Sequence, residues 1–312
     1  MRKLGVFTGA WMAATLLASG GAMAQVVGLG TAQAGATVQY GTAIAKIVSE
    51  NAGLQMRTQG LASTNQYAAR INAGELEFGL SNIIEATFAL SGGGFFDGRA
   101  HPNLRMAFTL FPLPITFFVK ESSGITTYDQ LAGAKTPTGW SSQKLGEYIF
   151  RGFFANIDKS YDSVRGVPIA AMPRMWDLYG QGELDFAFAI LNNPTTRELM
   201  TKVKARSISV SDDPAAVERM QKYLPSSYVT TDRNVDTGEM VKNIAFDFVV
   251  FVGAHVSDDV VYKVVKAVHQ ASDQFKSNET GVPPGMVSKT ALEYHPGAIR
   301  YYKEVGLWPP KD

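Results

Sequence analysis

A glycine-rich stretch at 28–35 lies between a short apolar run and a helical pattern, an arrangement that often binds nucleotide phosphates. The dinucleotide fingerprint Gly-x-Gly-x-x-Gly requires a third glycine, but Gly28 and Gly30 are followed by Gln33. No acidic residue closes the next predicted strand, and no Gly-Lys-Ser/Thr sequence follows. The stretch therefore predicts either a simple tight turn or a helix start whose amide groups favour a carboxylate or another small anion.

Polar, mostly uncharged side chains follow the ends of the predicted strands, where open α/β sheets bind their ligands. They suit hydrogen bonding to a small polar solute, although Ser, Thr and Asn are also the preferred helix caps. Trp140 would either cover the carbon skeleton of the solute or pack against its own helix. Arg174 would either pair with a carboxylate or lie in solvent. The candidate ligand-binding residues are Thr31, Gln33, Ser63, Asn65, Ser81, Asn82, Trp140, Ser141, Ser142, Arg174, Asn192, Asn193 and Thr195.

Residues suited to catalysis or metal binding are sparse. The histidines, His101, His255, His269 and His295, are not spaced as metal ligands, and the chain contains no cysteine. The nucleophile-elbow sequence Gly-x-Ser-x-Gly of α/β hydrolases does not occur. We therefore expect no catalytic residue, no metal and no cofactor. A secreted α/β hydrolase, with a Ser-His-acid triad assembled only in the fold, stays open as the alternative.

The elements that would position these residues alternate between strands and helices. The first part of the chain predicts strands at 26–30, 54–59 and 76–80, with helices at 37–50 and up to 73. The same order returns later, with strands at 134–137, 167–171 and 184–190 and helices at 143–154 and from 175 to 179. This alternation predicts parallel strands joined by right-handed crossovers, and hence doubly wound α/β lobes.

One short motif occurs in both parts of the chain, each time between a predicted helix and a predicted strand. Its two copies are Gly-Glu-Leu-Glu-Phe at 74–78 and Gly-Glu-Leu-Asp-Phe at 182–186. Each glycine is expected to end its helix in the left-handed conformation, and each Leu-acid-Phe to lead into a strand. The matching order of elements favours two similarly built lobes over a chance recurrence.

Two long β-prone runs, at 111–120 and 243–252, are interpreted as paired strands that cross between the lobes. The predicted fold class is α/β, with two doubly wound lobes joined by a two-strand hinge, as in type II periplasmic binding proteins. Residues 25–111 and 251–312 would form a discontinuous lobe 1, and residues 112–250 would form lobe 2. A hinge between two such lobes creates a cleft that can close on a ligand.

The first residues of the chain have the pattern of an export signal. Arg2 and Lys3 precede an apolar run at 4–18, and Ala22-Met23-Ala24 has the small-x-small pattern of a cleavage site. We expect residues 1–24 to be a signal peptide that sends the chain to the periplasm; a short membrane anchor is the alternative. Without Arg2 and Lys3, 27 basic residues face 28 acidic ones, so the formal net charge changes from +1 to −1. That balance gives no electrostatic footprint for nucleic acid.

After the predicted signal peptide, essentially the whole chain resembles the TAXI-type solute receptors of tripartite ATP-independent periplasmic (TRAP) transporters. The resemblance rests on the glycine-rich stretch, on residues 60–65 and 74–78, and above all on the segment YHPGAIRYYKEVG at 294–306. In that segment, His295 would cap a helix and Pro296 would occupy its first turn, so the segment reads as a structural signature.

The resemblance implies a binding protein that captures a small organic acid or an amino acid such as glutamate and delivers it to integral-membrane TRAP subunits. The family's opening loop, usually Gly-Thr-Gly-Ser-Thr-Gly-Gly with paired tyrosines after it, is matched at Gly28, Gly30 and Thr31 but not at 32–35, and Thr and Val stand at 37–38. Trp140 likewise departs from the family's Gly-Ser-Gly-Thr loop. These departures lie in the ligand loops, so the family's ligand does not transfer. A receptor that reports its ligand to a membrane sensor is the alternative among binding proteins.

Overall fold

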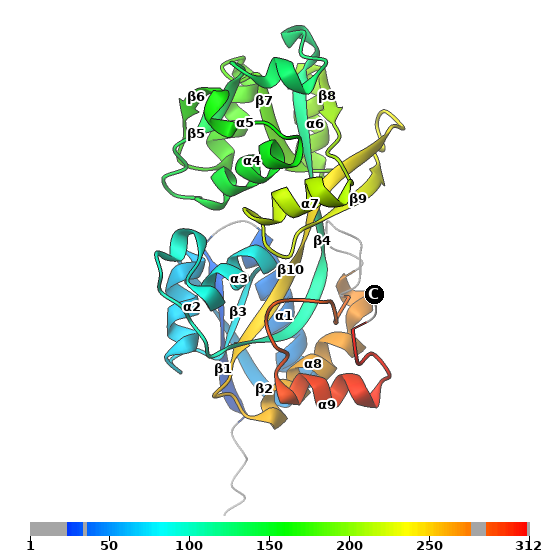
Figure 1. Ribbon diagram of the computed structural model, residues 1–312. Helices are drawn as coiled ribbons and strands as arrows, with labels where there is room; N and C mark the ends of the chain where they lie inside the picture. The colour runs from blue at the N-terminus through cyan, green and yellow to red at the C-terminus, as the bar shows by residue number, and fades with distance from the viewer. Residues whose placement is uncertain (1–23, 34–35, 276–284, 311–312) are drawn as a thin grey trace, which may run out of the picture.

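The computed structural model describes residues 24–33, 36–275 and 285–310. All but the last residue of the predicted signal peptide therefore lie outside the described residues. None of the helices in the described part of the chain combines the length and the apolar character that crossing a membrane requires. Figure 1 shows two groups of elements, one above the other, with two long strands running from one group into the other.

Lobe 1, the lower group in Figure 1, begins with a parallel sheet covered by helices. Strand β1 pairs in parallel with β2 and with β3, so all three strands end at the edge that faces the upper group. The apolar positions of α1 recur at helical spacing, and Tyr40, Ile44, Ile47 and Val48 are buried. The elements are β1 (Gln25–Ala32), α1 (Ala36–Asn51), β2 (Leu54–Leu61), α2 (Thr64–Asn72), β3 (Phe78–Asn82) and α3 (Ile83–Ser91).

The two long strands β4 (Leu104–Lys120) and β10 (Met240–Gly253) pair antiparallel and link the lobes, as expected from the two β-prone runs. They continue the sheet of lobe 1, giving the order β2-β1-β3-β10-β4-β7. The register between them shifts between Asp247 and Val249 and again between Val250 and Phe251. Such irregularities bend a strand locally, and here they lie at the predicted lobe boundary. The boundaries at 111/112 and 250/251, which fall inside these strands, stay a prediction.

Lobe 2, the upper group, is built on an aromatic core. Phe117 of β4 stacks on Phe153 at 4.2 Å between ring centroids, and Phe186 packs against both rings. Strands β5 and β6 form a separate parallel pair, and β7 and β8 extend the large sheet along β4. The elements are β5 (Lys135–Thr138), α4 (Leu145–Asn156), β6 (Arg165–Pro168), α5 (Met172–Gln181), β7 (Phe186–Ile190), α6 (Pro194–Val203), β8 (Ala205–Ile208), α7 (Pro214–Gln221) and β9 (Tyr228–Arg233).

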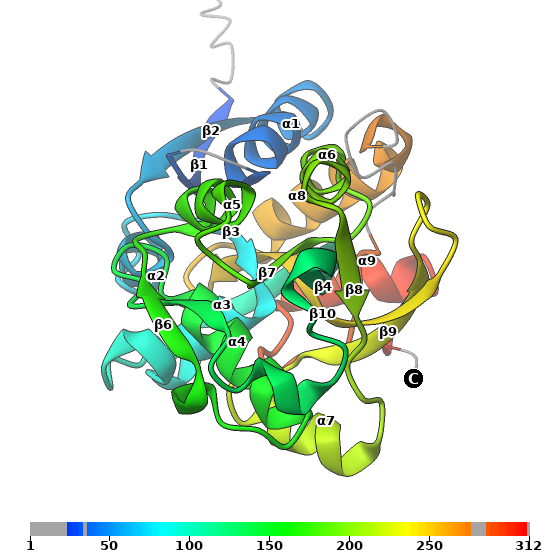
Figure 2. The same cartoon turned by 90° about the horizontal axis from the view of Figure 1, so that it is seen from above.

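The C-terminal helices α8 (Asp258–Gln270) and α9 (Pro296–Glu304) return to lobe 1, where α8 lies beside α1 (Figure 2). His295 caps α9 by accepting a hydrogen bond from the Gly297 N–H at 3.2 Å, and Pro296 opens the helix, as predicted. The described part of the chain also contains short 3-10 helices: η1 (Gly94–Phe96), η2 (Glu121–Ser123), η3 (Tyr128–Leu131), η4 (Tyr161–Ser163) and η5 (Ser272–Phe275).

The repeated motif has the same structure in both lobes, as predicted. Gly74 and Gly182 follow α2 and α5 with φ of 81° and 91°, in the left-handed region. The acid of each motif then accepts a hydrogen bond from the backbone of a neighbouring strand. Glu77 accepts from the Gly28 N–H at 2.6 Å, and Asp185 accepts from the Lys135 N–H at 3.0 Å. The motif therefore fixes the first strand of each lobe against the third.

Candidate functional site

The glycines of the opening stretch serve close packing. A Cβ atom on Gly28 would lie 2.5 Å from Leu76 Cδ1, and one on Gly30 would lie 2.7 Å from Tyr67 Cβ. Both glycines therefore let α2 and the residues before β3 approach β1 more closely than any side chain would allow. Residues 34 and 35 lie outside the described residues, so the turn itself is not placed.

Replacing Gly30 with Ala is expected to lower the free energy of unfolding by about 1–3 kcal/mol, because the new methyl group meets the base of the Tyr67 side chain. Gly60→Ala is the matched control, since its Cβ would find no atom closer than 3.7 Å, and it should change stability by less than about 0.5 kcal/mol. Urea unfolding of both variants measures the difference. Equal losses would contradict the packing role of Gly30.

A hydrogen-bonded cluster occupies the edge of lobe 1 that faces lobe 2. Its centre is Glu85, in the first turn of α3. Glu85 Oε2 accepts hydrogen bonds from Ser81 Oγ at 2.5 Å, Thr64 Oγ1 at 2.8 Å and Asn82 Nδ2 at 3.1 Å. Ser81, Asn82 and Thr64 are buried, whereas Glu85 keeps partial exposure. The structure thus brings two predicted site residues, Ser81 and Asn82, together around a carboxylate that the sequence analysis did not single out.

Desolvation dominates the electrostatics of this cluster. Burial raises the pKa of Glu85, while the hydrogen bonds from Ser81, Thr64 and Asn82 act in the opposite direction. Asn82 also caps α3, because its Oδ1 accepts from the Glu85 N–H at 3.0 Å. The N-terminus of α3 therefore stabilises the negative charge of Glu85, and Asn82, the N-cap residue, helps to hold that carboxylate in place.

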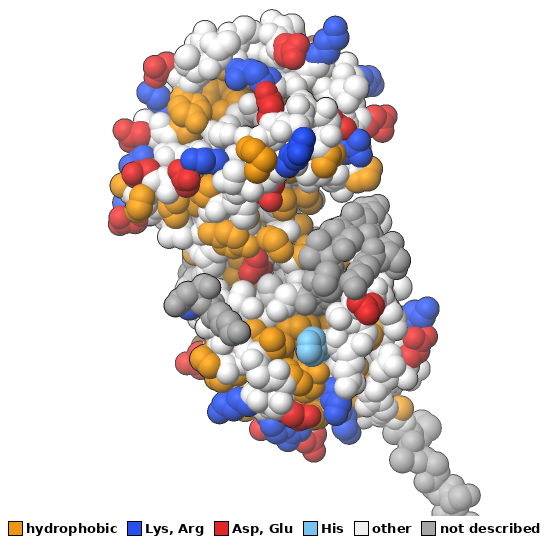
Figure 3. Space-filling model, turned by 90° about the vertical axis from the view of Figure 1, so that its right-hand side faces the viewer, with side chains coloured by type: hydrophobic (Ala, Val, Ile, Leu, Met, Phe, Trp, Pro, Cys, Tyr) orange, Lys and Arg blue, Asp and Glu red, His pale blue; other side chains and the backbone are white. Residues whose placement is uncertain are grey.

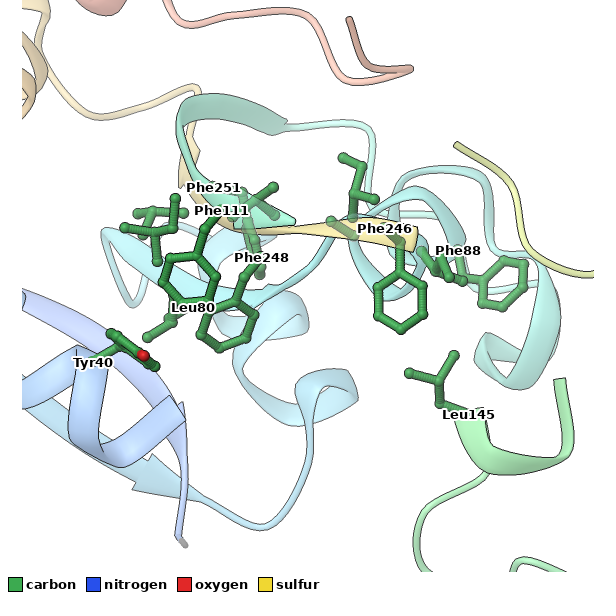
Figure 4. Close-up of a cluster of buried hydrophobic side chains, with 14 of the residues drawn as sticks. Tyr40, Leu80, Phe88, Phe111, Leu145, Phe246, Phe248 and Phe251 are labelled. Carbon is green, nitrogen blue, oxygen red and sulfur yellow. The ribbon is translucent and has the colours of Figure 1, made fainter. Parts of the chain in front are cut away.

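The two lobes touch through aromatic side chains next to this cluster. Tyr148 of α4 lies 5.1 Å from Phe88 of α3 and 5.9 Å from Phe95 of η1, measured between ring centroids. Figure 4 shows Leu145 of α4 directed toward Phe88 and Phe246. Asn65, one of the predicted ligand-binding residues, holds the backbone of Phe95 in place, because its Nδ2 donates a hydrogen bond to the Phe95 carbonyl at 3.1 Å.

A hollow of about 450 Å³ opens beside this aromatic contact and is lined from both lobes. Lobe 1 contributes Phe95 and Asp97, and lobe 2 contributes Ser141, Lys144 and other residues. The remaining lining residues are Gly94, Gly139, Trp140, Glu147, Tyr148, Arg151 and Tyr223. The volume is large enough for a small polar molecule, at the low end of typical ligand pockets.

Trp140 is buried in this structure. Its side chain is 1% exposed and packs against Phe150 and Phe188, with ring centroids 6.1 and 6.0 Å away. A Cβ atom on Gly146 would lie 2.3 Å from the indole ring, so the ring lies directly against the first turns of α4. Of the two interpretations of Trp140, the structure has packing against its own helix, and the role of the ring in covering the solute skeleton stays a prediction.

The other candidate residues of lobe 2 are more dispersed. Asn192 joins the β9–β10 connection, donating to the Arg233 carbonyl at 2.9 Å and accepting from the Val235 N–H at 3.1 Å. Arg174 is exposed in the first turn of α5, and Ser142 is exposed between β5 and α4. Asn193 is half-buried before α6, and the side chain of Thr195 is outside the description.

The remaining candidates of lobe 1 lie at the ends of β1 and β2. Thr31 is 2% exposed and packs over Gly41 of α1, so it supports the loop rather than presenting a hydroxyl to solvent. Gln33 is exposed beyond the end of β1. Ser63 is the N-cap residue of α2, but its side chain makes no capping hydrogen bond. Of this set, Gln33 and Ser63 keep polar groups that a ligand could use.

Charged side chains from both lobes line the hollow: Asp97, Lys144, Glu147 and Arg151. On the face shown in Figure 3, Lys, Arg, Asp and Glu are spread over both lobes, and mainly hydrophobic and uncharged side chains are visible between them. Among the described residues, no group of three or more His, Asp or Glu is placed to hold a metal ion. The region between the lobes therefore offers a ligand charged groups as well as hydrogen bonding and apolar contact.

The match to known families decides what kind of protein this is. Residues 29–306 match the model of the NMT1-like family. The chain belongs to the NMT1-like family. The match covers both lobes and the hinge strands of this NMT1-like chain, so the family describes the whole two-lobed unit.

Solved structures show the same fold. The Rhodopseudomonas palustris protein Rpa4515 with adipate has a TM-score of 0.55 and 16% identity, with 84% of this chain and 89% of that chain covered. MatC from Rhodopseudomonas palustris, with bound malate, has a TM-score of 0.54 and 14% identity, covering 83% and 89%. A binding-protein component of an ABC phosphonate transporter from Pseudomonas aeruginosa has a TM-score of 0.53 and 12% identity, covering 85% and 82%. The predicted fold class is confirmed: this NMT1-like chain has a mixed α/β fold of the type II periplasmic-binding-protein kind.

Proposed function

We propose that this protein is a periplasmic solute-binding receptor that captures a small organic acid or amino acid between its lobes. The observation that carries the proposal is the hollow of about 450 Å³, because both lobes line it and because Asn65, the neighbour of Thr64 in the lobe 1 cluster, donates a hydrogen bond to Phe95 of its lining. Domain interfaces are among the places where small-molecule sites preferentially occur, and a two-strand hinge allows the lobes to close. Membership of the NMT1-like family supports this reading.

The proposal extends to the membrane partner. The resemblance to TAXI-type receptors favours delivery of the solute to integral-membrane TRAP subunits, and the basic, apolar start of the chain favours export to the periplasm. Two of the structural neighbours hold dicarboxylates, adipate and malate, which makes small carboxylates a reasonable first class to test. Uptake of a bound solute by cells with and without the TRAP subunits distinguishes a transport receptor from a sensor.

A thermal-shift screen of carboxylates and amino acids tests solute binding directly. A bound solute should raise the melting temperature by mass action, and small-angle scattering should show a smaller radius of gyration if the lobes close. NAD and ATP should have no effect, because the opening stretch fails the nucleotide fingerprint. If every solute leaves both the melting temperature and the radius of gyration unchanged, the receptor proposal is wrong.

Ser141 and Ser142 give a residue-level test of the lobe 2 side. Both are exposed between β5 and α4, and Ser141 lines the hollow. The double variant Ser141→Ala/Ser142→Ala should weaken binding of a solute found in the screen by roughly tenfold, the worth of one or two neutral hydrogen bonds. Ser123→Ala, in η2 after the far end of β4, is the matched control. Unchanged affinity in the double variant would remove both serines from the site.

A further inference from the structure

The hydrogen bonds of Glu85 are unequally divided between its two oxygens. Ser81, Thr64 and Asn82 all donate to Oε2. No described residue donates a hydrogen bond to Oε1. A carboxylate can accept about four hydrogen bonds over its two oxygens. Oε2 of Glu85 is therefore saturated, whereas Oε1 can still accept hydrogen bonds.

The negative charge of Glu85 has no cationic partner within the described residues. None of the ion pairs there includes Glu85, and no Lys, Arg or His contributes to its pKa shift. Its three donors are two hydroxyls and an amide, which are neutral. Buried charges in proteins are normally paired, because desolvation of a lone carboxylate is costly. An open, partly exposed and unpaired carboxylate is therefore a feature that a ligand could complete.

The position of Glu85 places this carboxylate between the lobes. Glu85 and Phe88 are three residues apart on α3 and so lie on the same side of the helix. Phe88 on that side contacts Tyr148 of lobe 2. Thr64 and Ser81 lie at the edge of lobe 1 where α2 begins and β3 ends, which is the edge that faces lobe 2.

A purely structural role explains only part of this arrangement. Asn82 and Glu85 form a reciprocal cap at the start of α3, with Asn82 Oδ1 accepting from the Glu85 N–H and Asn82 Nδ2 donating to Oε2. That cap requires one carboxylate oxygen. Thr64 and Ser81, from two other elements, add donors to the same oxygen and hold the carboxylate in one orientation, which is how ligand-binding groups are preorganised.

We infer that Glu85 Oε1 is the acceptor for a cationic N–H group of the solute, such as an ammonium, so that the ligand is an amine or amino acid rather than a simple organic acid. This inference rests on the proposed solute-binding function and narrows its ligand class. The ammonium would supply the charge pairing that the described residues do not, on the side of α3 that carries Phe88, which contacts Tyr148 of lobe 2.

Matched solute pairs that differ only in the amine test the inference on the unaltered protein. Suitable pairs are L-glutamate and 2-hydroxyglutarate, L-leucine and 2-hydroxy-4-methylpentanoate, L-alanine and lactate, and putrescine and 1,4-butanediol. Titration calorimetry should give at least one amine that binds roughly 10- to 100-fold more tightly than its hydroxy counterpart, as expected for a charge-assisted hydrogen bond.

The variant Glu85→Gln keeps the shape of the side chain and removes its charge. It should abolish that preference, weakening the amine roughly 10- to 100-fold while changing the hydroxy compound less than about threefold. Glu75→Gln, exposed in the connection between α2 and β3, is the matched control and should bind as the unaltered protein does. Circular dichroism establishes that each variant is folded, and if Glu85→Gln does not fold, the preference of the unaltered protein decides.

Two results would overturn the inference, and they can be told apart. Tight binding of a hydroxy acid that matches or exceeds its amine, with Glu85→Gln unchanged, rejects the role of Glu85 while leaving the receptor proposal standing. No binding by any compound of the panel or of the carboxylate screen rejects the receptor proposal and, with it, the assignment of Glu85.

Discussion

Replacing Trp140 with Ala is expected to lower the free energy of unfolding by about 3–5 kcal/mol, the range for removing a large aromatic side chain from a core. The indole is 1% exposed, and it fills the space between Phe188 and the start of α4. Neither neighbour can follow it into the cavity, because Gly146 has no side chain and Phe188 is fixed in β7. Lobe 2 would therefore lose contacts that no rearrangement restores.

Urea unfolding followed by circular dichroism measures this loss. Trp140→Phe is the control, because it keeps an aromatic ring at the same place and should lose less than half as much. A Trp140→Ala variant of unchanged stability that no longer binds solute would contradict the core assignment and support the ligand-covering role.

Replacing Tyr148 with Ala is expected to weaken solute binding by about tenfold and to enlarge the radius of gyration of the ligand-free protein. The Tyr148 ring contacts Phe88 and Phe95 of the opposite lobe, and aromatic pairs contribute about 0.5–1.5 kcal/mol each. These contacts exist only when the lobes stand close together. Losing them shifts the population toward separated lobes and lowers the apparent affinity accordingly.

Small-angle scattering and titration calorimetry test the role of Tyr148 together. Tyr148→Phe keeps the ring and should behave as the unaltered protein does, which separates ring contact from any role of the hydroxyl. If the Tyr148→Ala variant has the unaltered radius of gyration and affinity, the contact between the lobes is incidental.

Local patterns made much of the fold predictable. Gly74 and Gly182 could be assigned because helix termination by a left-handed glycine depends on a few neighbouring residues. The pairing of β4 with β10 followed from two long β-prone runs. Helix α3 was missed because its segment, IIEATFALS, is apolar on almost every side, and five of its residues are buried. Such a helix has no polar face, and therefore no periodicity to detect.

The candidate site was less predictable, because its chemistry depends on contacts between distant residues. Glu85 is one acidic residue among many in the sequence, and its environment arises only when Thr64 and Ser81 meet it in the fold. The Asn82-x-x-Glu85 spacing is a capping signal that could have drawn attention to it. Trp140 and Asn192 were singled out in the sequence as possible ligand contacts. In the fold, both side chains instead contact residues of their own lobe.

The β4 and β10 strands, 17 and 14 residues long, belong to the hydrogen-bonded ladders of both lobes at once. Unfolding of either lobe would remove hydrogen-bond partners from β4 and β10, which the other lobe also needs. The protein should therefore unfold on heating in a single cooperative step, with calorimetric and van't Hoff enthalpies in agreement, rather than in two stages as two independent domains would.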